Sequence, residues 1–174
     1  MKKIILIGAG GHCVSCIDVI EKQKKFKIIG LIDNIKNKLL LGYKTIGNDK
    51  DLKKFSKKSY YTLITIGHTK NSKIRENLFR KFSKNGFKFP LVVSPLSYVS
   101  KHASIGEGTI VMHGAIINAG AKVGKNCIIN SKALIEHDAI IGDHCHLATR
   151  STVNGGVLIK DNSFIGSSSV IKQN

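Results

Sequence analysis

The chain has 174 residues, of which 42% are hydrophobic and 22% charged, values typical of a soluble globular protein. No apolar run approaches the roughly 20 residues that a membrane-spanning helix needs, so we expect no membrane insertion. Four cysteines in a chain of this length, without a signal peptide, are typical of reduced thiols and predict a cytoplasmic location.

The formal net charge of +17 is unevenly distributed. Residues 1–90 hold 19 Lys and 2 Arg against 6 acids, whereas residues 91–174 hold 6 Lys and 1 Arg against 5 acids. A basic first half would attract phosphate-bearing ligands, although a lysine-rich, solvated surface is the simpler interpretation. Only 3 of the 28 basic residues are Arg, the residue that nucleic-acid readers use most, so we expect no nucleic-acid partner.

The first half alternates strand-like and helix-like segments. This alternation predicts a small Rossmann-like βαβ domain with a parallel sheet over residues 1–90. The predicted strands are 3–7, 27–33, 60–66 and 88–93, and the predicted helices are 13–23, 50–57 and 71–84.

A glycine turn follows the first predicted strand. The run Gly8-Ala9-Gly10-Gly11-His12 lies between a strand and a helix, where backbone N–H groups can approach a phosphate. Asp33 ends the second predicted strand, where a carboxylate commonly meets a ribose hydroxyl. Cys13 stands where the dinucleotide fingerprint has its third glycine, so the turn favours a nucleotide phosphate in general over NAD. A tight turn without a ligand is the alternative.

The second half carries an internal repeat of six residues. An aliphatic residue occupies every sixth position from Val93 to Ile171, and a small residue nearly always stands two positions earlier, as at Ala115, Cys127 and Cys145. Period six fits neither an α-helix nor a simple amphipathic strand. It fits a triangular prism of stacked strands with 18 residues in each coil. Residues 91–174 are therefore predicted to form a left-handed parallel β-helix, with the two cysteines as packing residues.

Particular segments in both halves resemble one enzyme family. The most specific are the glycine turn at 8–12 and the segment 130–138, Asn-Ser-Lys-Ala-Leu-Ile-Glu-His-Asp. Supporting segments are Ile-Gly-Asp at 141–143, His146, and Asn-Gly-Gly at 154–156. The chain resembles hexapeptide-repeat sugar acyltransferases of the sialic-acid O-acetyltransferase and bacillosamine-type UDP-amino-sugar N-acetyltransferase group. In that family a nucleotide-binding βαβ domain precedes the β-helix.

The resemblance implies a catalytic role for His137, Asp138 and Gly155. Residue chemistry agrees, because acyl transfer from a thioester needs a base for the incoming amine or hydroxyl, and histidine titrates in the right range. Asp138 is placed to orient the imidazole. Gly155 follows His137 by 18 residues, one coil, and its N–H would be free to bind the developing oxyanion. The alternative for His137 is an exposed corner histidine.

Other residues match family positions in the ligand pockets. The resemblance places His146 beside acetyl-coenzyme A, Asn130 beside the reacting groups, and His12 and Asp33 in the nucleotide-sugar pocket with Gly8, Gly10 and Gly11. No metal is implied. The remaining histidines are expected on the coil surface, at His102, His113 and His144, and in a loop, at His68.

Two departures from the family pattern bear on the ligand sites. Thr149-Arg150 replaces a stretch that is usually small or glycine-rich, which would alter the acceptor or coenzyme pocket. The chain ends at Asn174, part-way round a coil, whereas family members usually continue for another coil or two that help to hold coenzyme A.

The leading hypothesis is acetyl-coenzyme A-dependent N-acetylation of a nucleotide-linked amino sugar, of the UDP-4-amino-4,6-dideoxyhexose type, by a homotrimer that serves bacterial surface-glycan synthesis. One alternative is O-acetylation of a sialic-acid-type sugar. Another is a non-catalytic binding protein with an incomplete coenzyme site. A zinc hydratase on the same β-helix is disfavoured, because His144 and His146 lie too close together for the required ligand spacing.

Overall fold

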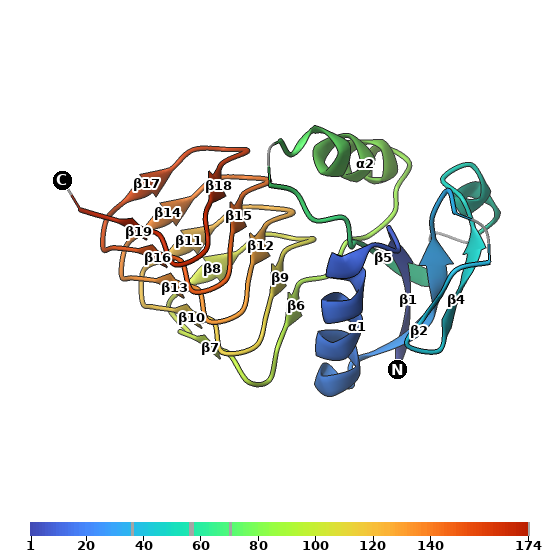
Figure 1. Cartoon of the computed structure of the whole chain (residues 1–174), viewed down its shortest axis with the longest axis horizontal. Coiled ribbons are helices and arrows are strands. Elements are labelled where there is room, and N and C mark those ends of the chain that lie inside the picture. Colours follow the sequence, from blue (N-terminus) through green and yellow to red (C-terminus); the bar gives the residue numbers. More distant parts are fainter. Residues whose placement is uncertain (36, 56–57, 70, 174) are drawn as a thin grey trace.

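The computed structural model describes residues 1–35, 37–55, 58–69 and 71–173, and it has two parts that lie side by side (Figure 1). A small α/β unit comes first in the chain, and a triangular stack of short strands follows. Helix α1 belongs to the α/β unit and lies between the sheet of that unit and the stack.

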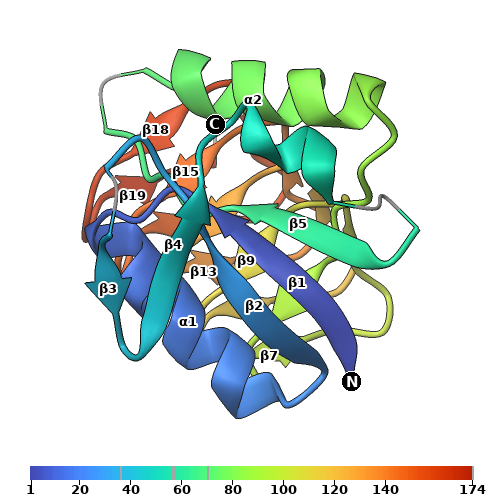
Figure 2. The same cartoon turned by 90° about the vertical axis from the view of Figure 1, so that its right-hand side faces the viewer.

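The α/β unit is built on a five-stranded sheet in the order β3-β4-β2-β1-β5 (Figure 2). Strands β1, β2, β4 and β5 run parallel, and β3 is antiparallel to β4. The strands are β1 Lys2–Ile7, β2 Phe26–Ile32, β3 Leu39–Leu40, β4 Tyr43–Gly47 and β5 Tyr60–Ile64. Because β1 lies between β2 and β5, the strand order reverses at β1/β5, the point where ligands of such folds bind.

Two helices cover opposite faces of this sheet. Helix α1 (Gly11–Gln23) buries Cys13, Cys16, Ile17 and Ile20 against Ile4 and other side chains of one face. Helix α2 (Lys73–Lys84) packs its phenylalanines on the other face, in a cluster that holds Ile5, Ile7 and Ile64. The predicted stop at Asn85-Gly86 is confirmed, since α2 ends at Lys84 and Gly86 has φ 78°.

Three predictions for this unit need correction. The expected helix 50–57 is a single 3₁₀ turn, η1 (Asp51–Lys54), and residues 56–57 lie outside the described residues. The expected strand 88–93 is divided around Pro90: Lys88 forms one bridge with Tyr61, whereas Val92–Val93 begins the β-helix. The hairpin of β3 and β4 was not predicted, because β3 has only two residues and its apolar run is short.

The second part confirms the predicted β-helix. Its two-residue strands form three parallel sheets, ordered β6-β9-β12-β15-β18, β7-β10-β13-β16-β19 and β8-β11-β14-β17. Partners in each sheet are 18 residues apart, as in Ile117↔Ile135 and Ile135↔Val153. The strands are β6 Val92–Val93, β7 Tyr98–Val99, β8 Ser104–Ile105, β9 Ile110–Val111, β10 Ile116–Ile117, β11 Lys122–Val123, β12 Ile128–Ile129, β13 Leu134–Ile135, β14 Ile140–Ile141, β15 His146–Leu147, β16 Thr152–Val153, β17 Leu158–Ile159, β18 Phe164–Ile165 and β19 Val170–Ile171.

The second residue of each strand points inward. All fourteen aliphatic residues of the six-residue repeat belong to one apolar cluster that fills the prism. Ala115, Ala121, Cys127, Ala133 and Cys145 occupy the small inward positions of the same cluster, so both cysteines are packing residues as predicted.

Each corner of the prism ends in a left-handed backbone conformation. From Gly108 to Ser168, every sixth residue has φ between 53° and 76°. Asp138 and His144 are two of these residues, with φ 58° and 60°. From Gly108 on, the repeat therefore fixes the backbone at each corner, including the one that carries His137.

The two parts share a core. Val92, Ile110, Met112 and Ile128 on the β6-β9-β12 face belong to the same cluster as the buried side of α1. This contact holds the start of α1, and the glycine turn before it, against one face of the β-helix.

Candidate active site

His137 lies at the corner between β13 and β14, with its side chain 64% exposed. Its Nδ1 is 3.0 Å from Oδ2 of Asp138. Because a carboxylate only accepts hydrogen bonds, Nδ1 carries the hydrogen, and in neutral imidazole Nε2 is then left as an acceptor. A base for an incoming nucleophile needs this arrangement.

Glycines on the neighbouring coils make room for this pair. A Cβ on Gly155, in the coil above, would lie 2.6 Å from Nε2 of His137, and a Cβ on Gly120, in the coil below, would collide with the Asp138 carboxylate. The predicted stacking of Gly155 over His137 is therefore found. Among the described residues, no backbone carbonyl accepts the Gly155 N–H, while Gly156 donates to the His137 carbonyl over 3.0 Å. We call His137, Asp138 and Gly155 the His137 corner.

A second group of predicted residues meets where the two parts join. The start of α1, the loop after β5 and the β12–β13 corner surround a hollow of about 520 Å³. We call it the junction hollow, and its lining residues are Gly11, His12, Ser15, Gly67, His68, Thr69, Asn130, Ser131, His146 and Thr149. It lies at the reversal of strand order between β1 and β5, where a ligand is expected.

The hydrogen bonds of His146 define its tautomer. Its Nδ1 is 2.6 Å from the main-chain carbonyl oxygen of His68, which only accepts, so Nδ1 donates. Nε2 is 3.2 Å from Nδ2 of Asn130 and accepts from that amide when the ring is neutral. Burial, together with the positive charge of Arg75, lowers the pKa of His146, which keeps the ring neutral near pH 7.

His12 and His68 bring unpartnered polar atoms to this hollow. Nε2 of His12 and both ring nitrogens of His68 are buried without a hydrogen-bond partner among the described residues. Burial is the main cause that lowers the pKa of His12 to about 3 and that of His68 to about 4, with Arg75 and His146 adding to both effects. Unsatisfied buried nitrogens are costly, and these atoms are covered by the surrounding protein.

The glycine turn adopts the shape that its sequence predicts. Gly8 has φ 104°, and a Cβ there would collide with Ile66, so glycine is required. Gly10 and Gly11 face open space. Gly10 is the N-cap residue of α1 and has no side chain to cap the helix. Backbone N–H groups of the first turn are therefore available to an anion.

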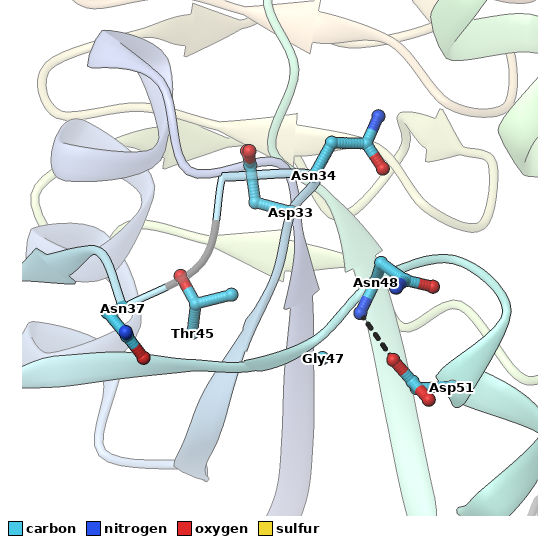
Figure 3. A pocket seen from close by; sticks show the side chains of 7 residues that line it. All are labelled: Asp33, Asn34, Asn37, Thr45, Gly47, Asn48 and Asp51. Atoms are coloured by element: carbon cyan, nitrogen blue, oxygen red, sulfur yellow. Dashed lines mark hydrogen bonds between the residues drawn. The ribbon is translucent and has the colours of Figure 1, made fainter.

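Asp33 supports this turn from the other side. Its Oδ2 accepts from the Ala9 N–H over 2.7 Å and its Oδ1 from the Ile35 N–H over 2.9 Å. Asp33 also lines a separate hollow of about 240 Å³ with Asn34, Thr45 and Asn48 (Figure 3). The carboxylate therefore holds the turn in place at the edge of a pocket.

Four other histidines were assigned by position alone. His102 is exposed, as expected. His144 is buried, against the expectation of a surface residue, because α2 covers its corner and Phe79 contacts its ring. His113 is partly covered and bonds to Ser94 and Asp18. His68 is in a loop, as expected, yet its contribution to the hollow was missed, because only the fold brings the end of β5 beside the end of β1.

The structure brings the predicted residues together in two separate places. His12, Asn130 and His146 line the junction hollow with Gly11, whereas the His137 corner contributes nothing to it. The corner after β13 and the corner after β12 are one prism face apart, on the order of 15–20 Å for six residues. In a single chain the predicted site residues therefore lie in two separate places.

The position of Thr149 and Arg150 is also clear. Thr149 lines the junction hollow, and Arg150 is exposed at the next position, a left-handed corner with φ 61°.

In the described part of the chain, no three His, Cys, Asp or Glu side chains are grouped to hold a metal ion. No helix in those same ranges is long and apolar enough to cross a membrane.

Comparison with known proteins identifies both parts. The family model described as "PglD N-terminal domain" matches residues 3–82, and "Bacterial transferase hexapeptide (six repeats)" matches residues 102–137 and 138–173.

Three solved structures are similar along nearly the whole chain. WeeI from Acinetobacter baumannii AYE has 26% identity and a TM-score of 0.86, over 99% of this chain and 82% of that one. Perosamine N-acetyltransferase from Caulobacter crescentus, as a mutant in complex with CoA and GDP-perosamine, has 23% identity and a TM-score of 0.83, over 100% and 90%. The acetyltransferase domain of PglB from Neisseria gonorrhoeae FA1090, in complex with acetyl coenzyme A, has 23% identity and a TM-score of 0.71, over 97% and 93%.

The last two likenesses establish the fold, and the family models cover both halves of the chain. The chain belongs to the hexapeptide-repeat acyltransferases that carry a PglD-type N-terminal domain.

Proposed function

We propose that this protein transfers the acetyl group of acetyl-coenzyme A to the amino group of a nucleotide-linked amino sugar, of the UDP-4-amino-4,6-dideoxyhexose type. In this proposal residues 1–90 hold the nucleotide and residues 91–174 carry out acyl transfer. The observation that carries it is the His137 corner, where an exposed imidazole is oriented by Asp138 beneath a glycine of the next coil.

The geometry of this corner suits a direct transfer. Nε2 of His137 takes a proton as the sugar amine attacks the thioester carbonyl, the C–S bond breaks, and the coenzyme A thiolate leaves and is protonated. The Gly155 N–H, directly above, is the donor proposed for the oxyanion of the tetrahedral intermediate. Asp138 holds Nδ1–H of the ring and stabilises the imidazolium that forms.

The N-terminal part suits a nucleotide diphosphate. We assign Gly10, Gly11 and the N-terminus of α1 to phosphate contact, because both glycines border open space and no side chain caps the helix, and we assign to Gly8 the tight turn that places them there. The hollow beside Asp33 lies on one side of this turn and the junction hollow on the other. A nucleotide crossing the turn would place its sugar beside His12, Asn130 and His146. The excess of basic residues over 1–90 favours such an anion.

The two half-sites suit a homotrimer. If prisms pack around a three-fold axis, the His137 corner of one subunit can face the junction hollow of the next. Acetyl-coenzyme A would then lie between subunits, with His146 and Asn130 on one side and the His137 corner on the other. We also propose a cytoplasmic location and a role in surface-glycan synthesis, in line with the CoA and GDP-perosamine bound to the similar Caulobacter enzyme.

The proposal is tested by turnover. Purified protein is incubated with acetyl-coenzyme A and a panel of UDP- and GDP-linked 4-amino-dideoxyhexoses, and thiol release is followed together with the mass of the acetylated product. We expect turnover on at least one amino sugar and none with its 4-hydroxy analogue. Turnover on free sialic acid alone would indicate O-acetylation, and coenzyme A binding without any turnover would indicate a binding protein. The O-acetyltransferase and the binding protein are the alternatives that this assay excludes.

A further inference from the structure

Arg75 of α2 is completely buried, although arginine is seldom buried without an acidic partner. Across residues 1–35, 37–55, 58–69 and 71–173, no carboxylate pairs with its guanidinium, and its Nη2 has no hydrogen-bond partner. Burial lowers the pKa of Arg75 to about 10, so the side chain is still a cation at neutral pH. An unpaired buried charge of this kind needs a reason.

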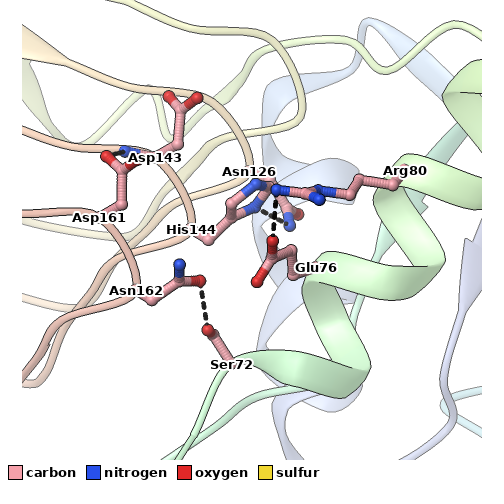
Figure 4. A network of polar contacts seen from close by, with 8 residues as sticks. All are labelled: Ser72, Glu76, Arg80, Asn126, Asp143, His144, Asp161 and Asn162. Atoms are coloured by element: carbon pink, nitrogen blue, oxygen red, sulfur yellow. Dashed lines mark hydrogen bonds and ion pairs between the residues drawn. The ribbon is translucent and has the colours of Figure 1, made fainter.

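The hydrogen bonds of Arg75 connect the two parts of the protein. Nη1 donates to the carbonyl of Ile64, at the end of β5, over 2.5 Å and to that of Ile66 over 3.1 Å. Nε donates to the carbonyl of Asn126, at a corner of the β-helix, over 3.0 Å. Figure 4 shows other polar contacts in the region where α2 lies beside the β-helix corners. There Asn126 contacts His144, and Ser72 contacts Asn162.

The segment that Arg75 holds leads directly to the junction hollow. Two residues after Ile66, the carbonyl of His68 accepts the Nδ1–H of His146, and Asn130 then donates to Nε2 of the same ring. Thr65, within the held segment, donates its hydroxyl to the Gly8 carbonyl in the glycine turn over 2.6 Å. One fork-shaped side chain thus fixes the loop that both aligns His146 and supports the turn.

We propose that Arg75 is a positioning residue for the proposed acetyl transfer: by holding the Ile64–His68 segment against the β-helix, it fixes the tautomer and orientation of His146 in the junction hollow. This inference rests on the proposed function. The titratable side chains that line the hollow are His12 from α1, His68 from the loop and His146 from the β-helix, and His144 lies beside Asn126 at a neighbouring corner. Burial is the main cause that lowers the pKa of each of these histidines, and the charge of Arg75 contributes in the same direction.

The test compares Arg75→Met and Arg75→Lys with the wild type. Lysine retains the charge without the planar fork, whereas methionine removes both. Imidazole ¹⁵N–¹H spectra report the tautomer and the titration of each histidine, independently of activity. We expect the wild-type His146 to hold its hydrogen on Nδ1 alone. In both variants the ring should become a mixture of tautomers, and in Arg75→Met His12, His68 and His146 should also titrate at higher pH.

Kinetics supply the second measurement. Misplacing the ring is expected to lower kcat/KM about 10- to 100-fold in both variants, without rescue by lysine. Arg80→Met is the matched control, because Arg80 lies on the same helix, is 67% exposed and pairs with Glu76. It should leave His146 and turnover unchanged. If Arg75→Met fails to fold, Arg75→Lys is used alone.

Folded Arg75 variants with the wild-type His146 tautomer would overturn the inference, even if their melting temperatures fell. If wild-type protein shows no turnover on any amino sugar, the proposed function fails. The spectra still decide whether Arg75 positions His146.

Discussion

The His137 corner and the junction hollow are built in different ways. The corner comes from residues of one coil and the next, so its geometry follows from the 18-residue repeat, and its imidazole is exposed. The hollow is formed where α1 and the loop after β5 pack on the β-helix; His68 and His146 are buried there, and His12 is partly buried. A repeat can therefore place side chains by their count along the chain, whereas a pocket between two parts depends on how those parts pack.

The two places also differ in burial, and this difference suits them to different chemical roles. The corner is exposed and leaves Nε2 of His137 free, which suits the proposed base of a thioester reaction. The hollow holds neutral imidazoles with unpartnered nitrogens, which fits ligand recognition. In the proposed mechanism each place supplies what the other lacks, so we expect a complete active site only where the two meet.

The largest loss of activity is expected from a substitution in the His137 corner. His137→Ala removes the base and should lower kcat/KM about 1,000-fold, on the order of 4 kcal/mol, with little change in the KM for acetyl-coenzyme A. The side chain is exposed, so the melting temperature should stay close to that of the wild type. His102→Ala, another exposed histidine on the β-helix, is the control and should retain activity. Wild-type turnover by His137→Ala would exclude the mechanism.

The next prediction concerns the stability of the prism core next to the His137 corner. Ile135→Ala truncates a fully buried residue two positions before His137 and should cost about 3 kcal/mol of unfolding free energy. Ile140→Ala truncates an isoleucine that is 42% exposed on the next strand and should cost less than about 1 kcal/mol. Denaturant unfolding of both variants measures the difference. Equal losses would mean that the repeat does not set which side chains point inward.

A smaller effect is expected from filling the space above the imidazole. In Gly155→Ala the new methyl group would press on His137 and displace Nε2, with a loss of about 10- to 100-fold in kcat. Gly166→Ala is the matched control, since its Cβ would meet only the Ser169 hydroxyl, at 3.2 Å. Steady-state kinetics of the two variants test this, and equal activity would show that the close stacking is unimportant.

The last prediction uses pH to separate the hollow from the corner, and its effect per pH unit is the smallest. The folded pKa of His12 is about 3, below the ordinary 6.5, so between these values the unfolded chain binds a proton that the folded chain does not. Stability should therefore rise with pH across this window, by up to about 1.4 kcal/mol per pH unit from this one group. His12→Gln should reduce that slope, measured by urea unfolding between pH 4.5 and 6.5. His102→Gln should keep it, and an unchanged slope in His12→Gln would contradict burial of His12.

The same contrast explains what the sequence predicts and what it does not. The period of six placed all fourteen inward residues and the stacking of Gly155 on His137, because backbone pairing in a β-helix depends only on the count along the chain. The end of α2 at Asn85-Gly86 and the turn at Gly8 follow from local backbone preferences.

Contacts between distant segments escaped prediction. His68 lies 78 residues from His146, and nothing in its own segment shows that the two meet. His144 has the spacing of an exposed corner residue but is covered by α2. Residues 88–93 were predicted to form one strand, although Pro90 divides them between the two parts. Such outcomes depend on how the α/β unit docks on the prism, for which the sequence carries no periodic signal.

Subunit complementation tests the shared site most directly. His137→Ala and His146→Gln subunits carry different tags, are co-expressed, and hetero-oligomers are purified through both tags. If each site takes His137 from one subunit and His146 from its neighbour, both parents are inactive and every mixed trimer has one intact site of three, so the purified hetero-oligomers should have about a third of wild-type activity. Hetero-oligomers as inactive as either parent, or a protein that is monomeric at assay concentration, would contradict the account.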